Sequence, residues 1–114
     1  MNSRLREEIL VLHANICEGL ADPTRILILY TLDEKARNVT ELAAALGVTQ
    51  PTTSRHLKML RNRGMVIAER QAQAVIYSLT DRRVIEALDI LRAVLADGLH
   101  SQGELASSVT KDLV

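Results

Sequence analysis

Two short helices are predicted in the middle of the chain from the spacing of their apolar residues. In the first helix, Leu42, Ala43 and Leu46 repeat at helical spacing. The Thr40 hydroxyl can accept a hydrogen bond from a backbone N–H of the first turn, so we expect Thr40 to cap this helix. We expect Gly47 to end it, because glycine adopts a positive φ without a Cβ penalty.

The second helix has a defined start and a defined inner side. Thr49 is its expected cap, and Pro51 falls in the first turn, where a missing N–H costs nothing. Thr53, Leu57 and Leu60 follow at spacings of four and three, which puts them on one side. Two helices joined by a tight turn are typical of a helix-turn-helix, but paired helices with a glycine corner also occur in ordinary all-α cores.

The outer side of the second helix is polar and basic. Such an exposed helix suits the major groove of DNA, where the Gln50 amide can read adenine and the Arg55 guanidinium can read guanine. An ordinary solvated face is the alternative. The predicted DNA contacts on this helix are Thr49, Gln50, Thr52, Ser54, Arg55, His56 and Lys58.

After Gly64 the apolar period changes to two. Residues 65–67 and 75–79 are β-favouring and predict two strands, and the polar segment Glu69–Gln73 fits a hairpin tip between them. A hairpin directly after a DNA-reading helix can act as a wing that reaches flanking phosphates or the minor groove. A plain edge hairpin that closes the core is the alternative. The predicted DNA contacts of the wing are Arg70, Gln71 and Gln73.

Amphipathic helices are predicted at both ends of the chain. The first covers residues 3–20, and the next begins with Asp22 as its cap and Pro23 at its first position. Thr80 is expected to cap the last helix, with Asp81 in its first turn. We expect the first and last helices to bury their apolar stripes against each other and against a second copy of the chain. The predicted dimer contacts are Leu5, Ile9, Leu12, Ile16, Leu88, Leu91 and Leu95.

Length and composition indicate one small helical domain. The 114 residues are 47% apolar but include only two aromatic side chains, so the core must be aliphatic, which favours helices. The expected fold is mainly α with a small β-hairpin, a winged helix-turn-helix over residues 1–100. Residues 101–114 are expected to form a partly disordered tail or a short arm. Without an apolar run long enough for a membrane span or a secretory signal, the protein is expected to be cytoplasmic.

The charge is unevenly distributed although the formal net charge is zero. Between Ser54 and Thr80, Glu69 is the only acidic residue among five basic ones. Salt confines electrostatic attraction to about 10 Å, so local positive charge is what DNA phosphates feel. The basic block therefore favours double-stranded DNA as a partner. Its basic residues are Arg55, Lys58, Arg61, Arg63 and Arg70.

Enzymatic chemistry has little support in the sequence. We find no nucleophile–base pair, no phosphate-cradling glycine loop and no paired acids in an evident cleft. The single cysteine, Cys17, cannot form an internal disulfide or a multi-thiolate metal site. We therefore expect neither an enzymatic activity nor a cofactor.

The order of the elements resembles the ArsR/SmtB family of winged helix-turn-helix repressors over roughly residues 15–95. The resemblance is carried by LADPTRILIL at Leu20–Leu29, ELAAALGVTQPTTSRHLKML at Glu41–Leu60 and IYSL at Ile76–Leu79. It implies a homodimeric, sequence-specific DNA-binding repressor that is released from its operator by an inducer. A winged-helix module that binds protein instead of DNA is the alternative, and it would tolerate alanine at Arg55 or Gln50.

The resemblance also implies metal or thiol sensing, but this chain departs from the family's metal sites. Members that bind metal through the first helix of the pair carry cysteines where this chain has Ala43 and Ala45, and a methyl group cannot coordinate. Members that bind zinc through the last helix carry four ligands there, of which this chain keeps only Asp81 as a plausible one. The corresponding residues here are Asp81, Arg83, Val94 and Asp97.

Arg83 and Asp97 suggest a different role for these positions. They are about 21 Å apart along one helix, at 1.5 Å per residue, and cannot meet within a subunit. Across an antiparallel pair of helices they can meet. We hypothesise that Arg83 of one subunit faces Asp97 of the other; two solvated surface charges are the alternative.

His13 and Cys17 are a further candidate site for sensing, because residues four apart share one helix face. If the terminal helices pack together, His100 and Glu104 near the end of the last helix could complete a metal site. Cys17 could instead sense oxidants through a stabilised thiolate. A cysteine that merely fills space in an apolar helix is the alternative. The sequence does not identify the inducer.

Overall fold

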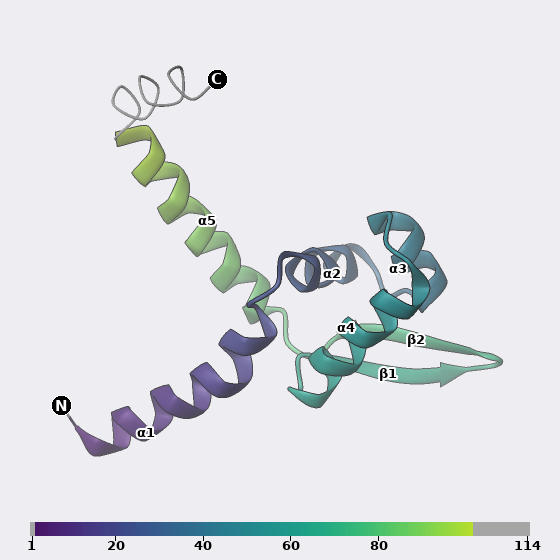
Figure 1. The fold of residues 1–114 in the computed structure, drawn as a ribbon, viewed down its shortest axis with the longest axis horizontal. Coiled ribbons are helices and arrows are strands. Elements are labelled where there is room, and N and C mark those ends of the chain that lie inside the picture. Colours follow the sequence, from purple (N-terminus) through teal and green to yellow (C-terminus); the bar gives the residue numbers. More distant parts are fainter. Residues whose placement is uncertain (1, 102–114) are drawn as a thin grey trace. The chain divides into compact units, whose positions relative to one another are not determined.

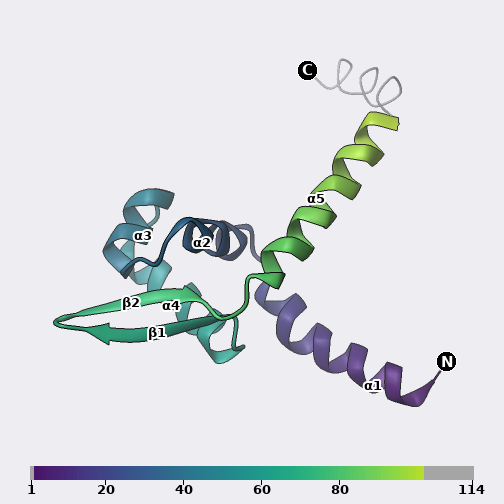
Figure 2. The same cartoon turned by 180° about the vertical axis from the view of Figure 1, so that it is seen from behind.

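The elements of the computed structural model follow the predicted order (Figures 1 and 2). The structure describes residues 2–101, so most of the predicted tail lies outside the described residues. The chain forms two compact units, residues 1–82 and a second unit that begins at Arg83. Within the described residues it is mainly helical with one antiparallel hairpin, which confirms the predicted fold class. The elements are α1 (Ser3–Leu12), the π-helical segment η1 (His13–Cys17), α2 (Pro23–Glu34), α3 (Val39–Leu46), α4 (Gln50–Asn62), β1 (Val66–Gln71), β2 (Ala74–Leu79) and α5 (Arg83–Ser101).

The core of the first unit lies between α2, α3, α4 and the hairpin. Helix α2 packs against α3, α4 and β2, and α4 packs against β1. Ile28 and Leu29 of α2, Leu42 of α3, and Leu57 and Leu60 of α4 are fully buried. The apolar spacing therefore predicted the inner sides of α3 and α4 correctly.

The turn between α3 and α4 has the predicted glycine corner, with Gly47 at φ 66°. The predicted cap at Thr40 is wrong, because α3 begins at Val39, two residues earlier than that cap implies, and Asn38 caps it. The Asn38 side chain accepts the Glu41 N–H at 2.8 Å, and the Glu41 carboxylate accepts the Asn38 N–H at 3.0 Å. This reciprocal capping box satisfies two backbone donors at once, which a single hydroxyl cannot do.

The hairpin has longer strands and a tighter tip than predicted. Glu69, Arg70 and Gln71 belong to β1, because their backbones pair with β2. Ala72 and Gln73 form the turn, and Ala72 has a φ of 56°. A two-residue hairpin turn needs positive φ to match the twist of its strands. The polar side chains of residues 69–71 suggested a longer tip, but side-chain polarity does not show whether a backbone is paired in a sheet.

A backbone bridge ties the connection between α2 and α3 to the wing. The Arg37 N–H donates to the Tyr77 carbonyl at 3.1 Å, and the Tyr77 N–H donates to the Arg37 carbonyl at 2.8 Å. The sequence did not predict this pairing. It fixes the start of the helix-turn-helix beside β2.

The structure bears on two predictions about the terminal helices. The predicted helix over residues 3–20 is confirmed as helical through residue 19, but it is not uniform, because α1 ends at Leu12 and the wider turn of η1 follows it. The last helix begins at Arg83 and is not capped by Thr80. The Thr80 N–H still donates to the Met65 carbonyl at 3.2 Å, so Thr80 continues the hairpin instead of starting a helix.

Candidate nucleic-acid interface

Helix α4 has one buried side and one exposed side, as predicted. Thr53, Leu57 and Leu60 are fully buried. The Thr53 hydroxyl donates to the Thr49 carbonyl at 2.8 Å, which satisfies a polar group that would be costly to bury alone. The exposed side chains of the helix include Gln50, Ser54, Arg55 and Lys58.

Hydrogen bonds connect Thr49, Thr52 and Arg55 at the start of α4. Thr49 caps the helix as predicted, accepting the Thr52 N–H at 3.3 Å, and its hydroxyl donates to the Thr52 hydroxyl oxygen at 3.0 Å. Nη2 of Arg55 donates to the same Thr52 oxygen at 3.2 Å. Thr52 therefore orients the guanidinium in the free protein. Less side-chain entropy is then lost when Arg55 binds a partner.

His56 differs from the other predicted DNA contacts because it is turned toward α2. It is half-buried, and its Nδ1 lies 3.3 Å from Nη1 of Arg25. Arginine carries only donors, so Nδ1 of His56 is the acceptor in this pair. The pair joins residues 31 positions apart and has no local signal in the sequence.

An open groove joins α3, α4 and the wing. Ser54 of α4 and Gln73 of the wing tip, two of the predicted DNA contacts, both line it. Arg70 and Gln71 are exposed on β1. The complete lining is Asn38, Val39, Thr40, Ser54, Gln73, Ala74, Val75 and Tyr77.

The candidate metal ligands that the structure describes lie on two different helical segments. Among residues 2–101, no three His, Cys, Asp or Glu side chains are placed to share an ion. His13 and Cys17 are exposed on η1 and His100 is exposed on α5, whereas Glu104 lies outside the described residues. Ala43 presents a buried methyl group on α3. Within the described residues, no group of donors therefore offers the three or four ligands that a zinc ion takes from a protein.

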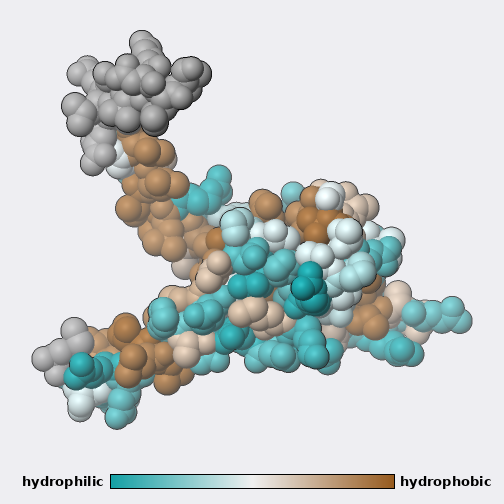
Figure 3. Space-filling view, in the orientation of Figure 1, coloured by the Kyte–Doolittle hydropathy of each residue, from teal (hydrophilic) through white to brown (hydrophobic). Residues whose placement is uncertain are grey.

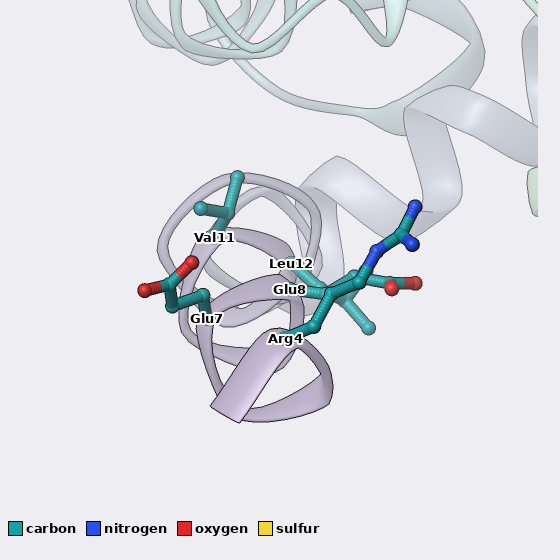
Figure 4. A pocket seen from close by; sticks show the side chains of 5 residues that line it. All are labelled: Arg4, Glu7, Glu8, Val11 and Leu12. Atoms are coloured by element: carbon teal, nitrogen blue, oxygen red, sulfur yellow. The ribbon is translucent and has the colours of Figure 1, made fainter. Parts of the chain in front are cut away.

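A shallow hollow lies along α1, and every side chain that lines it belongs to that helix (Figure 4). Arg4 and Glu8, one turn apart, point to one side of the helix in this view, whereas Glu7 and Val11 point to the other. A hollow on the surface of a single helix does not enclose a small molecule. It gives no support to an inducer site at this place.

The two terminal helices both expose apolar side chains (Figure 3). Of the predicted dimer contacts, Ile16 is half-buried and Leu88 is only 6% exposed, so Leu88 is already buried in the single chain. Burying the exposed ones against another surface would be favourable. Despite this apolar surface, no helix within residues 2–101 has the length and apolarity needed to cross a membrane. The exposed predicted contacts are Leu5 (44%), Ile9 (48%), Leu12 (43%), Leu91 (59%) and Leu95 (63%).

Comparison with known proteins points to one family of regulators. The family model described as bacterial regulatory protein, arsR family, matches residues 22–68, from the cap of α2 into β1. The HTH-type transcriptional repressor SmtB of Mycobacterium tuberculosis is 43% identical over 77 residues, which are 68% of this chain and 57% of SmtB. The HTH-type transcriptional regulator CmtR of Mycobacterium bovis is 37% identical over 97 residues, which are 84% of this chain and 80% of CmtR. The match thus spans less than two thirds of SmtB but most of CmtR.

A similar solved structure is the homodimeric winged helix-turn-helix DNA-binding domain of Mb0332 from Mycobacterium bovis. It has a TM-score of 0.72 at 26% sequence identity, and the match covers 82% of this chain and 87% of that one. This likeness confirms the winged helix-turn-helix fold.

Proposed function

This chain belongs to the ArsR family of bacterial regulatory proteins, and from that premise we propose that it is a homodimeric repressor that reads operator DNA with α4. The proposal is carried by the anchoring of α4, whose inner side is fully buried while its outer side is polar and exposed. Buried Thr53, Leu57 and Leu60 prevent the helix from rotating its polar side away from a partner.

In the proposed complex, the exposed side of α4 lies in the major groove. The Gln50 amide can form two hydrogen bonds with adenine, and the Arg55 guanidinium can form two with guanine. The wing flanks α4 and reaches the phosphates on one side, where contacts fix the position of the protein without reading sequence. The supporting contacts in this proposal are Thr49 at the cap of α4, Thr52, Ser54 and Lys58 on α4, and Arg70, Gln71 and Gln73 on the wing.

The proposed dimer forms through α1 and α5. Both helices expose leucines in the single chain, and the similar domain of Mb0332 is homodimeric. In this dimer Arg83 of one subunit would face Asp97 of the other. A two-fold axis would present two copies of α4 to major grooves about 34 Å apart, one turn of DNA.

Repression follows from occupancy of the operator, because a bound dimer excludes other proteins from the same DNA. The similar protein SmtB is a repressor. We propose that an inducer ends this occupancy, with His13 and Cys17 on η1 as the candidate sensing residues. Both are exposed in the single chain and therefore accessible to ions or oxidants.

Fluorescence anisotropy on labelled DNA tests the DNA-binding part of the proposal. The probe is a duplex of about 30 base pairs, long enough for two half-sites, selected from a random pool by the wild-type protein. Affinity should fall steeply with salt, and Lys58→Ala should lower the slope of log Kd against log salt by about one. Equal affinity for the selected duplex and a scrambled duplex of the same composition would contradict the proposal.

The same assay tests sensing when zinc, nickel or hydrogen peroxide is added. Loss of release by peroxide in Cys17→Ser, but not in His13→Ala, would assign thiol sensing to Cys17. Loss of release by a metal ion in both variants would assign a metal site. Release that is unchanged in both variants would exclude η1 as the sensor.

A further inference from the structure

Arg25 joins three segments of the first unit through one side chain. Its Nε donates to the Gly19 carbonyl at 2.9 Å, and its Nη2 donates to the Glu18 carbonyl at 3.1 Å. Its Nη1 lies 3.3 Å from Nδ1 of His56. Arg25 itself belongs to α2, so the guanidinium links the chain after η1, α2 and the middle of α4.

A second arginine connects α4 to the same stretch of chain. Arg63, the C-cap residue of α4, donates through Nη1 to the Ala14 carbonyl in η1. The chain at Gly19 is also closely packed. Gly19 is buried, and a Cβ on it would lie 2.5 Å from Sδ of Met65. Residues 14–19 are therefore fastened to α4 at its C-terminus by Arg63 and at its middle by Arg25 and His56.

The hydrogen-bonding groups of Arg25 make His56 the acceptor in their pair. A guanidinium has five N–H donors in a rigid planar fork and no acceptor. Two directions of the fork are already committed to backbone carbonyls, which fixes the plane of the guanidinium. The imidazole Nδ1 is the acceptor for the remaining direction, so Arg25 ties His56 in the middle of α4 to α2 and to the chain after η1.

We propose that Arg25 is a positioning residue for operator recognition, which acts through His56 to hold α4 in its DNA-reading orientation. The proposal rests on the proposed DNA-binding function. It reassigns His56 from a DNA contact to the internal acceptor of Arg25. The competing assignment is a direct contact between His56 and DNA.

Asparagine and glutamine at position 56 separate the two assignments. The amide oxygen of asparagine occupies nearly the place of Nδ1 and can accept from Arg25, whereas that of glutamine lies one bond further out, near the place of Nε2. His56→Leu removes the acceptor altogether. Arg25→Lys keeps the positive charge but lacks the planar fork that serves three acceptors.

The experiment measures affinity for the selected duplex and for its scrambled control, with thermal unfolding and sedimentation to show that each variant is folded and assembled like wild type. His56→Leu and Arg25→Lys should each weaken binding to the selected duplex about three- to tenfold, the effect of one internal hydrogen bond, and leave binding to the scrambled duplex unchanged. Combining them should add little, because both remove the same link. His56→Asn should restore most of the affinity, and His56→Gln should not.

Two results would overturn the proposal: His56→Asn as weak as His56→Leu, which indicates direct DNA contact, or His56→Leu equal to wild type. If the wild-type protein binds the two duplexes equally well, the proposed function is wrong, and the proposed role of Arg25 in operator recognition is wrong with it. If the wild-type protein prefers the selected duplex, the variants test the role of Arg25 alone. The His56 variants keep the test valid even if Arg25→Lys does not fold.

Discussion

Arg82 and Asp33, 49 positions apart in the chain, form a two-point ion pair. Nε of Arg82 donates to Oδ1 of Asp33 at 2.8 Å, and Nη2 donates to Oδ2 at 3.1 Å. Asp33 lies in the last turn of α2, and Arg82 follows β2. The pair therefore fastens the exit of the wing to α2, on which the helix-turn-helix also packs.

Asp33→Asn should lower the free energy of unfolding by about 0.5–1 kcal/mol, because it weakens a two-point ion pair that is partly shielded from water. The Asp33 side chain is 21% exposed and that of Arg82 is 59% exposed. Chemical denaturation measures the change. Asp89→Asn is the matched control, since its pair with Arg92 has side chains 49% and 70% exposed. An equal decrease in the free energy of unfolding of the two variants would show that the Arg82–Asp33 pair stabilises the protein no more than an exposed surface pair.

Arg55→Ala should weaken binding to the selected duplex by about 1–3 kcal/mol, which corresponds to roughly five- to 150-fold, if Arg55 makes a two-bond contact with guanine. Anisotropy titration at fixed salt gives the value. Arg4→Ala removes the same charge from α1, on the surface seen in Figure 4, and should have little effect. A similar loss of affinity in both variants would mean that the total charge of the protein determines binding, and that Arg55 makes no specific contact.

Replacing Leu91 and Leu95 with glutamine should weaken dimerisation at least about tenfold, because each exposed leucine loses its burial in the partner surface. Analytical ultracentrifugation over a range of concentrations measures the dissociation constant. Leu27→Gln is the control, because Leu27 is 53% exposed on α2, outside the proposed interface. Dimerisation that resists the double replacement would exclude this part of α5 from the interface.

Gly19→Ala should destabilise the protein by about 1–3 kcal/mol, the range for overpacking a filled site. The added methyl would lie 2.5 Å from Sδ of Met65, which is itself only 4% exposed. Thermal unfolding measures the loss. The same replacement in a Met65→Ala background should cost clearly less, because the obstructing sulfur is gone. An equal cost in both backgrounds would place the strain elsewhere.

The capping of α2 by Asp22 should make stability depend on pH in one direction. The Thr24 N–H, 2.7 Å from Oδ1, holds the pKa of the Asp22 carboxyl below its ordinary value of 3.8, with a smaller contribution in the same direction from the positive charge of Arg25. A lowered folded-state pKa means that the stabilisation is present at neutral pH and lost as pH falls through that pKa.

The melting temperature of wild type should therefore exceed that of Asp22→Ala most at neutral pH, and the difference should shrink below about pH 4. Asp22→Asn keeps a capping acceptor that does not titrate, so its advantage over Asp22→Ala should change little with pH. Scanning calorimetry from neutral to acidic pH makes the comparison. A wild-type advantage that grows on acidification would contradict the assigned sign.

Local chemistry made much of this fold predictable. The burial of Thr53, the glycine corner at Gly47 and the caps at Thr49 and Asp22 are each set by residues within one helical turn, and the structure confirms them. The errors lie at element ends. Thr40 was a reasonable cap, but Asn38 with its Glu41 partner forms the better one.

The sequence by itself determined the order of the elements, the two sides of α4 and the family, because periodicity, caps and motifs are local properties of the chain. Only the tertiary structure decided that His56 meets Arg25 and that Asp33 meets Arg82, pairs separated by 31 and 49 positions. Such partners depend on how helices pack after they have formed. No local pattern encodes that packing, since the same polar side chain can face water or a distant donor with an identical neighbourhood in sequence.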